Sequence, residues 1–357
     1  MAEKTGIRRV ATSAAAVLVG WSILRKKPAS AGGDDSAGAR DDESRGRGAD
    51  RPTAIPFAGW KDILWRTYQQ LGKDRVLLVA AGVTFYVLLA LFPALTALVS
   101  IYGIFADPQM VIEHVEAMSD FMPEGAVDII GGQMARIAEQ PSGQLNLGFI
   151  GGLAITLWSA NNGMKALFQA TNVAYNEEED RGFVRLTATT FLLTLGAIAL
   201  LILTLSAIVV LPILLGFVGL DEWTSALLQY GRWPVLFIVI IGGIAILYRV
   251  GPSRASAQWR WLMPGSIAAA VMWLVTSLLF SWYVANFDSY NETYGSLGAV
   301  IAFMVWIWLS ATIIIMGAEL NSETEHQTRI DTTKGDNAPM GTRQAQVADT
   351  LGQRIDK

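Results

Sequence analysis

Long apolar segments dominate the central part of the chain. A helix needs about 20 residues to cross the roughly 30 Å of hydrocarbon in a bilayer, and six segments reach that length, the fourth only just. They are residues 76–105, 145–174, 184–218, 234–250, 261–286 and 297–320. In hydrocarbon every backbone polar group must be satisfied within the structure, so segments of this length span as helices. The pattern predicts an all-α fold, a polytopic membrane helix bundle with six core transmembrane helices.

Amphipathic segments accompany the apolar ones. Residues 57–74 place aromatic and aliphatic side chains along one side and charged side chains elsewhere, which predicts an N-terminal helix lying in the membrane surface. Residues 108–121 and 123–140 carry apolar residues at helical spacing in an otherwise acidic connection. They predict short external amphipathic helices, either resting on the outer leaflet or forming a packed cap over the bundle.

The two ends of the chain differ in composition from the central part. Residues 1–56 form an N-terminal extension in which a short apolar run, 10–24, precedes a linker rich in Gly, Ser, Ala, Asp and Arg. The run is shorter than a usual span, so it could span, lie on or leave the membrane. We expect the linker and the tail at 322–357 to be disordered, because they have little apolar surface to bury. The membrane domain is therefore expected at 57–321.

Composition supports a membrane location and narrows the chemistry. Hydrophobic residues make up 52% of the chain and charged residues only 16%, against about a quarter charged in soluble domains. The chain has no cysteine, which excludes disulfides, thiolate catalysis and cysteine-bound metal. Its two histidines, His114 and His326, fall on opposite sides of the predicted bundle, so we expect no metal site and no cofactor.

The distribution of basic residues predicts the orientation. Arginine and lysine gather before the first apolar segment, after the second, fourth and sixth, and are scarce in the alternate connections. By the positive-inside rule both ends of the core face the cytoplasm, and an even number of spans agrees with this. We therefore expect a multi-pass membrane protein whose core begins and ends in the cytoplasm.

A polar stripe interrupts the second apolar segment. Its members recur at intervals of three and four residues, so they share one face of a helix. They are Asn162, Lys165, Gln169, Asn172 and Asn176, with Asn161 beside them. Each amide alone is best explained as a hydrogen bond between helices, but the aligned set also fits the wall of a polar cleft.

The connection before the last apolar segment is polar and aromatic. It contains Asp288, Tyr290, Glu292 and Tyr294. An interfacial aromatic belt would explain these residues. The functional alternative is an outer rim that binds a headgroup or gates the cleft.

Three stretches carry a family resemblance. They are AAGVTFYVLLALFPALTALVSIYGIF, LWSANNGMKALFQATNVAYNEEEDRGF and YNETYGSLGAVIAFMVWIWLSATIIIMGAELN, in that order. Over roughly residues 57–322 the chain resembles the YihY/BrkB family of bacterial inner-membrane proteins, formerly labelled ribonuclease BN-like. The resemblance implies six transmembrane helices with cytoplasmic ends. It also implies links to envelope lipid export or virulence.

Two functions are compatible with these features. The first is a transporter-like protein that handles a lipid or another amphipathic envelope molecule through a polar cleft, with membrane lipids as partners. The alternative is a structural or scaffolding membrane protein whose polar residues only join helices. We expect no enzyme and no nucleic-acid partner, because cleavage of a phosphodiester with metal ions needs clustered His, Asp or Glu ligands.

The last expectation concerns the inner mouth of the cleft. Lys165 and Glu319 both fall near the cytoplasmic ends of their helices, and an unpaired charge is costly in apolar surroundings. We predict that they approach one another or share a polar network with Asn161, Asn172 and Asn321.

Overall fold

The computed structural model describes residues 42–105, 142–218, 222–286, 297–335 and 337–355. Within these ranges the fold is helical. The long elements are α3 (Phe57–Lys73), α4 (Val76–Phe105), α7 (Ser142–Ala174), α8 (Phe183–Val218), α9 (Glu222–Val250), α10 (Trp259–Asn286) and α12 (Leu297–Glu325). A short 3-10 helix, η1 (Pro52–Ala54), precedes α3, and α13 (Gln346–Asp349) lies near the C-terminus. The expected all-α fold is confirmed for this part of the chain.

Four of the helices are long and apolar enough to cross a membrane by themselves. Their apolar stretches are Phe183–Thr204, Tyr230–Val250, Trp259–Val284 and Val300–Glu325. A shorter apolar helical stretch, Val76–Ala90, lies in α4. These helices agree with a membrane protein, whereas the full count of six spans stays a prediction. The external helices expected at 108–121 and 123–140 lie outside the described residues.

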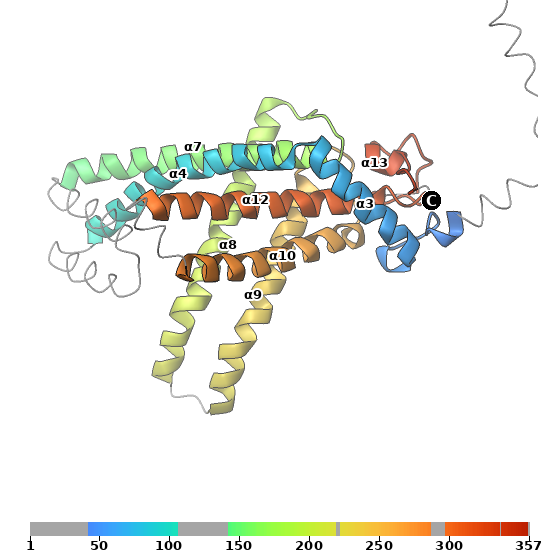
Figure 1. The fold of residues 1–357 in the computed structure, drawn as a ribbon. Helices are drawn as coiled ribbons and strands as arrows, with labels where there is room; N and C mark the ends of the chain where they lie inside the picture. Colours follow the sequence, from blue (N-terminus) through green and yellow to red (C-terminus); the bar gives the residue numbers. More distant parts are fainter. Residues whose placement is uncertain (1–41, 106–141, 219–221, 287–296, 336, 356–357) are drawn as a thin grey trace, which may run out of the picture.

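The helices do not form one parallel bundle. Figure 1 shows α4, α7, α12 and α10 running in similar directions, with α4 packed on α7 and α10 packed on α12. The α8 and α9 helices run at a steep angle to this group and extend away from it. The sequence alone predicts that each segment is helical but contains no information on this crossing. Much of the apolar surface of α8 and α9 is left uncovered by the rest of the described chain.

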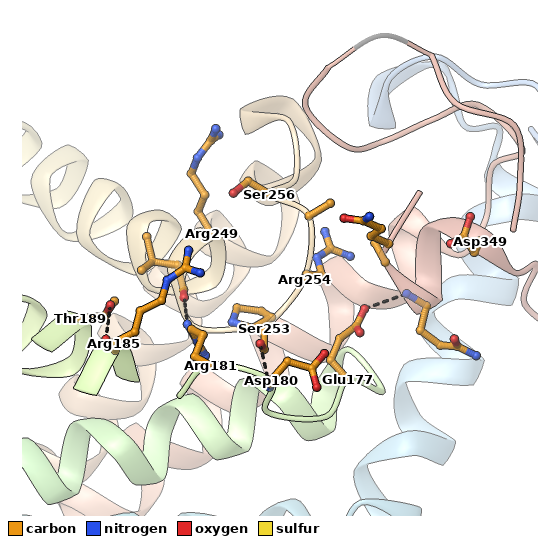
Figure 2. Close-up of a pocket in the computed structure, with 16 residues that line it drawn as sticks. Glu177, Asp180, Arg181, Arg185, Thr189, Arg249, Ser253, Arg254, Ser256 and Asp349 are labelled. Carbon is orange, nitrogen blue, oxygen red and sulfur yellow. Dashed lines mark hydrogen bonds between the residues drawn. The ribbon is translucent and has the colours of Figure 1, made fainter. Parts of the chain in front are cut away.

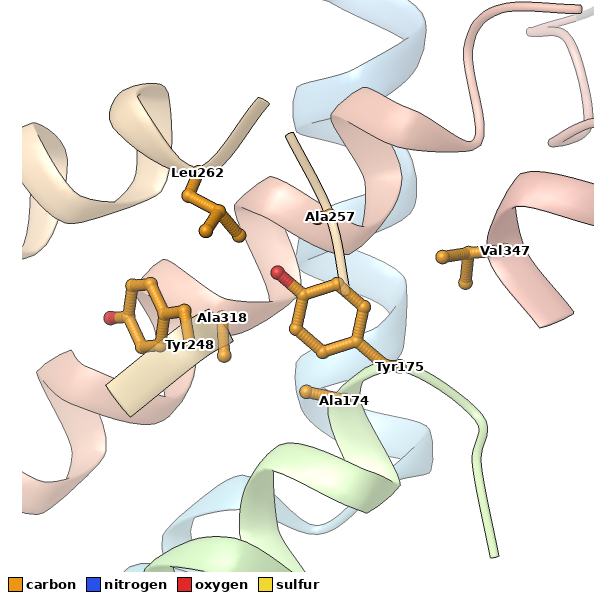
Figure 3. Close-up of a cluster of buried hydrophobic side chains, with 7 residues drawn as sticks. All are labelled: Ala174, Tyr175, Tyr248, Ala257, Leu262, Ala318 and Val347. Atoms are coloured by element: carbon orange, nitrogen blue, oxygen red, sulfur yellow. The ribbon is translucent and has the colours of Figure 1, made fainter. Parts of the chain in front are cut away.

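One end of the helix group is densely packed. A buried hydrophobic cluster there joins the last residues of α7 to α9, α10, α12 and α13 (Figure 3). Its largest side chains, Tyr175 and Tyr248, are 0% and 1% exposed, and the Tyr248 hydroxyl donates to the Ile314 carbonyl at 2.6 Å. The full cluster is Ala174, Tyr175, Tyr248, Ala257, Leu262, Ala318 and Val347. This cluster holds the helix ends and the connections that carry the candidate site.

Two glycines let α10 and α12 approach closely. A Cβ atom at Gly265 would collide with the Gly317 carbonyl oxygen and with the Asn321 side chain. A Cβ atom at Gly317 would collide with the Tyr248 hydroxyl. Small residues at such contacts are a common means of packing membrane helices.

The segments that precede α3 and follow α12 in the sequence pack against each other, which corrects the expectation of disorder for residues 42–55, 322–335 and 337–355. The α12 helix continues to Glu325, past the expected boundary at residue 321. Arg47 is 2% exposed and donates to the carbonyls of His326, Gln327 and Gly352. Polar contacts therefore order these two segments, although their low content of apolar residues predicts disorder.

Candidate functional site

A cavity of about 700 Å³ lies at the packed end of the helix group. It is bounded by the connection after α7, the start of α8, the end of α9, the connection to α10, and the segment that leads into α13. Its lining residues are Glu177, Asp180, Arg181, Arg185, Thr189, Arg249, Val250, Pro252, Ser253, Arg254, Ala255, Ser256, Gln344, Ala345, Gln346 and Asp349 (Figure 2). We call it the helix-end cavity. Its volume is in the range of small-molecule sites.

The end of α7 positions the acidic edge of this cavity. Asn176 has a left-handed backbone, with φ of 54°, and its amide donates to the Val173 carbonyl at 3.0 Å. The Glu177 amide donates to the Asn172 carbonyl at 2.8 Å. This pair of hydrogen bonds is a Schellman motif, in which asparagine tolerates the left-handed position better than most residues. Asn176 therefore ends the helix, and the chain turns so that Glu177 reaches the cavity.

Asn172 joins the end of α7 to two other segments. Its Nδ2 donates to Glu179 Oε2 at 2.9 Å, and its Oδ1 accepts from the Ser253 amide at 2.7 Å. The side chain is buried and both of its polar ends are satisfied. Asn172 is thus a packing residue next to the cavity rather than part of its lining.

Glu179 and Arg181 form a compact ion pair beside the cavity. Arg181 donates to Glu179 from Nε and Nη2, each at 2.6 Å, and also to the Val250 and Gly251 carbonyls. Burial alone would raise the pKa of Glu179, but the hydrogen bonds from Arg181 and Asn172 outweigh it and lower that pKa to about 2. The Arg181 charge is therefore committed to Glu179 and to the end of α9.

Arg254 is the most buried cation of the site. Its Nη2 donates to both carboxylate oxygens of Glu325, at 2.7 and 2.8 Å, and the two side chains are 2% and 0% exposed. The guanidinium lies over the Tyr175 ring at 4.4 Å. Burial would lower the pKa of Arg254, but the Glu325 charge raises it, so the arginine stays charged. This pair fixes the α9–α10 connection to the end of α12.

Arg185 and Arg249 carry positive charges that, unlike those of Arg181 and Arg254, are not held in the ion pairs described above. Arg185 is exposed in the first turns of α8, and in the described part of the chain its guanidinium takes part in no ion pair. Arg249 donates to the Ala257 carbonyl at 3.0 Å and lies over the Trp259 ring at 4.5 Å. Trp259 is half exposed at the start of α10. Aromatic and basic residues at helix ends are typical of the lipid–water boundary.

The polar stripe on α7 does not line this cavity. Asn161 is buried with its Oδ1 unpartnered, Asn162 is half-buried, and Gln169 is exposed. The Lys165 ammonium lies over the Phe183 ring at 5.3 Å. The stripe thus divides among several environments, and its role as a cleft wall stays a prediction.

The structure does not pair Lys165 with Glu319. Glu319 is 1% exposed, and the carboxyls of Asp74 and Glu323 lie close to it. Its neighbours belong to α12 and to the turn before α4, whereas Lys165 faces the start of α8. Nearby Asn321 is fully buried, accepts from the Gly265 amide at 2.7 Å and donates to the Leu262 carbonyl at 2.9 Å. Asn321 therefore joins α12 to α10.

Some of the predicted site residues fall outside the part of the chain that the structure describes. The outer rim residues Asp288, Tyr290, Glu292 and Tyr294 lie outside the described residues, as does His114. Within the described ranges, no group of three or more His, Cys, Asp or Glu side chains is arranged to hold a metal ion.

Sequence reasoning missed the cavity itself. The arginines that follow the second and fourth apolar segments, Arg181, Arg185, Arg249 and Arg254, served only to orient the helices. The available signal was that the positive-inside rule assigns all these charges to one side. Acidic and basic residues in several connections on the same side of the membrane can form a shared site. No local sequence pattern predicts which of them come together.

Comparison with known proteins assigns the chain to a family. The family model of virulence factor BrkB matches residues 67–341. A Bacillus subtilis relative named "Putative ribonuclease-like protein YfkH" is 30% identical over 68% of this chain and 88% of its own. A UPF0761 membrane protein of Alteromonas mediterranea is 28% identical over 75% of this chain and 92% of its own. No solved structure matches. The chain is a membrane protein of the BrkB family, which includes the UPF0761 membrane proteins.

Proposed function

We propose that the protein is a transporter-like protein that handles a lipid or another amphipathic envelope molecule, with the helix-end cavity receiving the polar part of that molecule. The observation that carries this proposal is the position of the cavity. Its wall includes Arg185 and Thr189 of α8 and Arg249 of α9, and both helices continue away from it with exposed apolar side chains. Val184 is 79% exposed, Leu192 71% and Ile246 42%. A charged cavity that adjoins such a surface suits a molecule with a polar head and apolar chains.

The proposal includes a cytoplasmic position for the cavity in the inner (plasma) membrane. Arg66, Lys73 and Arg75 lie before or at the start of α4, at the same end of the helix group as the arginines of the cavity. The end of α12 contacts both groups of basic residues, because Arg66 binds Glu323 at 2.5 Å and Arg254 binds Glu325. The positive-inside rule then favours the cytoplasm for this end. A cysteine that replaces exposed Ser256 should react with an impermeant maleimide only after cells are permeabilised. Reaction in intact cells would reverse the orientation.

A photoactivatable phospholipid tests the cavity as a lipid site. Purified full-length protein in liposomes that contain a lipid with a diazirine near its headgroup should form crosslinks at residues 181–189 and 249–256. The double variant Arg185→Gln with Arg249→Gln should lose most of them, whereas Arg260→Gln, an exposed arginine outside the cavity, should keep them. Crosslinks confined to the flanks of the apolar helices would contradict a headgroup site.

A scaffolding protein is the alternative, because Asn172 and Asn321 act as packing residues. A lipid translocation assay separates the two functions. Liposomes that contain the protein should move a fluorescent phospholipid between leaflets faster than protein-free liposomes do. Equal rates, together with no crosslinks in the cavity, would favour the scaffold.

A further inference from the structure

We infer that the helix-end cavity recognises a zwitterionic headgroup, one that carries a phosphate and a primary ammonium separated by a short linker. This inference rests on the proposed function and adds the chemical class of the ligand. It derives from the way that positive and negative side chains are separated within one cavity.

Figure 2 shows this separation directly. Arg185 lies on one side of the cavity with Thr189, whereas Glu177 lies on the other side, towards Asp349. Arg249 extends from the end of α9 on the same side as Arg185. The cavity is therefore polarised, with a cationic side next to α8 and α9 and an anionic side next to the connection after α7.

The charges that face a ligand are fewer than the charges in the lining. Arg181 is bound to Glu179, and Arg254 is bound to Glu325. Asp349 accepts hydrogen bonds from the Gly341 and Arg343 amides, so its carboxylate already serves the turn before α13. Four groups remain for a ligand, namely Arg185, Arg249, Glu177 and Asp180.

The cationic side suits a phosphate. Arg185 sits in the first turns of α8, where the helix dipole adds positive potential. Arg249 is held by the Ala257 carbonyl and by the Trp259 ring, which orients its guanidinium while leaving other N–H donors. Two guanidinium groups on one side of a cavity can bind phosphate oxygens with directed hydrogen bonds.

The anionic side suits an ammonium. Glu177 Oε1 accepts from the Gln346 amide at 2.7 Å, which leaves acceptor capacity on its carboxylate. Burial raises the pKa of Glu177, and the carboxyls of Asp180 and Asp349 raise it further against the opposing Gln346 amide and Arg254. A ligand ammonium would relieve this repulsion and would donate the hydrogen bonds that these oxygens can accept.

The geometry implies an order of preference among phospholipids. Phosphatidylethanolamine has both groups and N–H donors on its amine. Phosphatidylcholine has the charge but no N–H donor, and phosphatidylglycerol has no cation. We expect about fivefold tighter binding of the ethanolamine lipid than of the glycerol lipid, since one partly exposed ion pair is worth up to about 1 kcal/mol.

Calorimetric titration of the detergent-solubilised full-length protein tests this order. The probes are dihexanoyl-phosphatidylethanolamine, -phosphatidylcholine and -phosphatidylglycerol, together with glycerophosphoethanolamine, which has no acyl chains. The double variant Glu177→Gln with Asp180→Asn should bind the ethanolamine lipid as weakly as the glycerol lipid, whose own affinity should not fall. Arg185→Gln with Arg249→Gln should weaken all three lipids, and Arg260→Gln should change none.

The outcomes separate the inference from the function beneath it. Equal affinity of the unmodified protein for the ethanolamine and glycerol lipids would overturn the zwitterion inference but leave a lipid-handling protein. Absence of binding by all three lipids would overturn the proposed function. Binding of glycerophosphoethanolamine as tightly as the lipid would preserve the headgroup chemistry and replace the lipid with a soluble ligand.

Discussion

Arg254 and Glu325 form an ion pair that water does not reach. One guanidinium nitrogen of Arg254 donates to both oxygens of Glu325, and the two side chains are 2% and 0% exposed. Thr332 donates a further hydrogen bond to Glu325 at 2.6 Å. The pair joins the α9–α10 connection to the last residue of α12, so the geometry of the cavity depends on it.

Breaking this pair from one side should be costly. Arg254→Met should lower the free energy of unfolding by about 3–5 kcal/mol, because it leaves a buried carboxylate without its partner. Thermal unfolding in detergent, followed by circular dichroism, measures the loss. Adding Glu325→Leu to Arg254→Met should restore much of the stability, and exposed Arg260→Met is the control. Losses that simply add in the double variant would contradict the coupling.

The ion pair of Glu179 and Arg181 predicts that the stability of the protein depends on pH. The pKa of Glu179 is lowered from 4.5 to about 2, so this carboxylate contributes stability that is present above about pH 4.5. The contribution should decline as the pH falls towards 2, because protons then bind the unfolded chain before the folded one. Glu179→Gln should therefore melt below the unmodified protein at pH 7, and the difference should shrink in acid. Exposed Glu178→Gln serves as the matched control, and a difference for Glu179→Gln that stays constant with pH would contradict the assignment.

The contact between α10 and α12 predicts which glycines tolerate a methyl group. Gly265→Ala and Gly317→Ala should each destabilise the protein by about 1–3 kcal/mol or more, since the added Cβ meets backbone or a buried hydroxyl. Gly242→Ala in α9 has open space around it and should be neutral or stabilising, as alanine favours helix more than glycine does. Melting temperatures of the three variants in one detergent make the comparison. Similar values for all three would show that the helices can separate without loss.

Arg47 should control the order of the C-terminal segment. Its Nη2 donates to the Gly352 carbonyl at 2.7 Å, and Arg47→Met would remove this donor from the buried carbonyl. We expect trypsin to cut after Arg329 and Arg343 several-fold faster in this variant, as read by mass spectrometry. Arg51→Met, at a side chain that is 65% exposed, should leave the rate unchanged. An unchanged rate in Arg47→Met would mean that the segment is held by other contacts.

The helices were predictable from sequence because a long apolar run has few alternatives in a membrane. The expected start at residue 184 and the observed start of α8 at Phe183 differ by one position. Helical spacing also put Asn172 and Gln169 on one face correctly, but it does not state what that face meets. Asn172 is 5% exposed against two connections, whereas Gln169 is exposed. The two side chains differ in exposure because different segments pack against them, and the periodicity of the sequence does not predict which segments those are.

The terminal segments and the cavity were less accessible to sequence reasoning for a related reason. Residues 326–355 lack apolar periodicity, so they resemble a disordered tail. In the described parts, 326–335 and 337–355, polar partners far away in the chain hold these residues in place, such as Asp42 for Arg329 and Arg354. Likewise Glu177 and Arg254 become part of one site only when the α7 and α9 ends meet. Rules based on local composition detect neither case.

The hydrogen bond between Arg47 and Gly352 also has a consequence for biogenesis. It joins positions 305 residues apart, so the ribosome must synthesise the chain through residue 352 before the contact can form. The membrane helices can insert during synthesis, but the segment that carries Arg47 must wait for residue 352 to emerge. A messenger RNA truncated before codon 352 would produce a protein that lacks this hydrogen bond. Proteases that act on loosely packed segments would then degrade chains that lack residue 352 faster than chains that contain it.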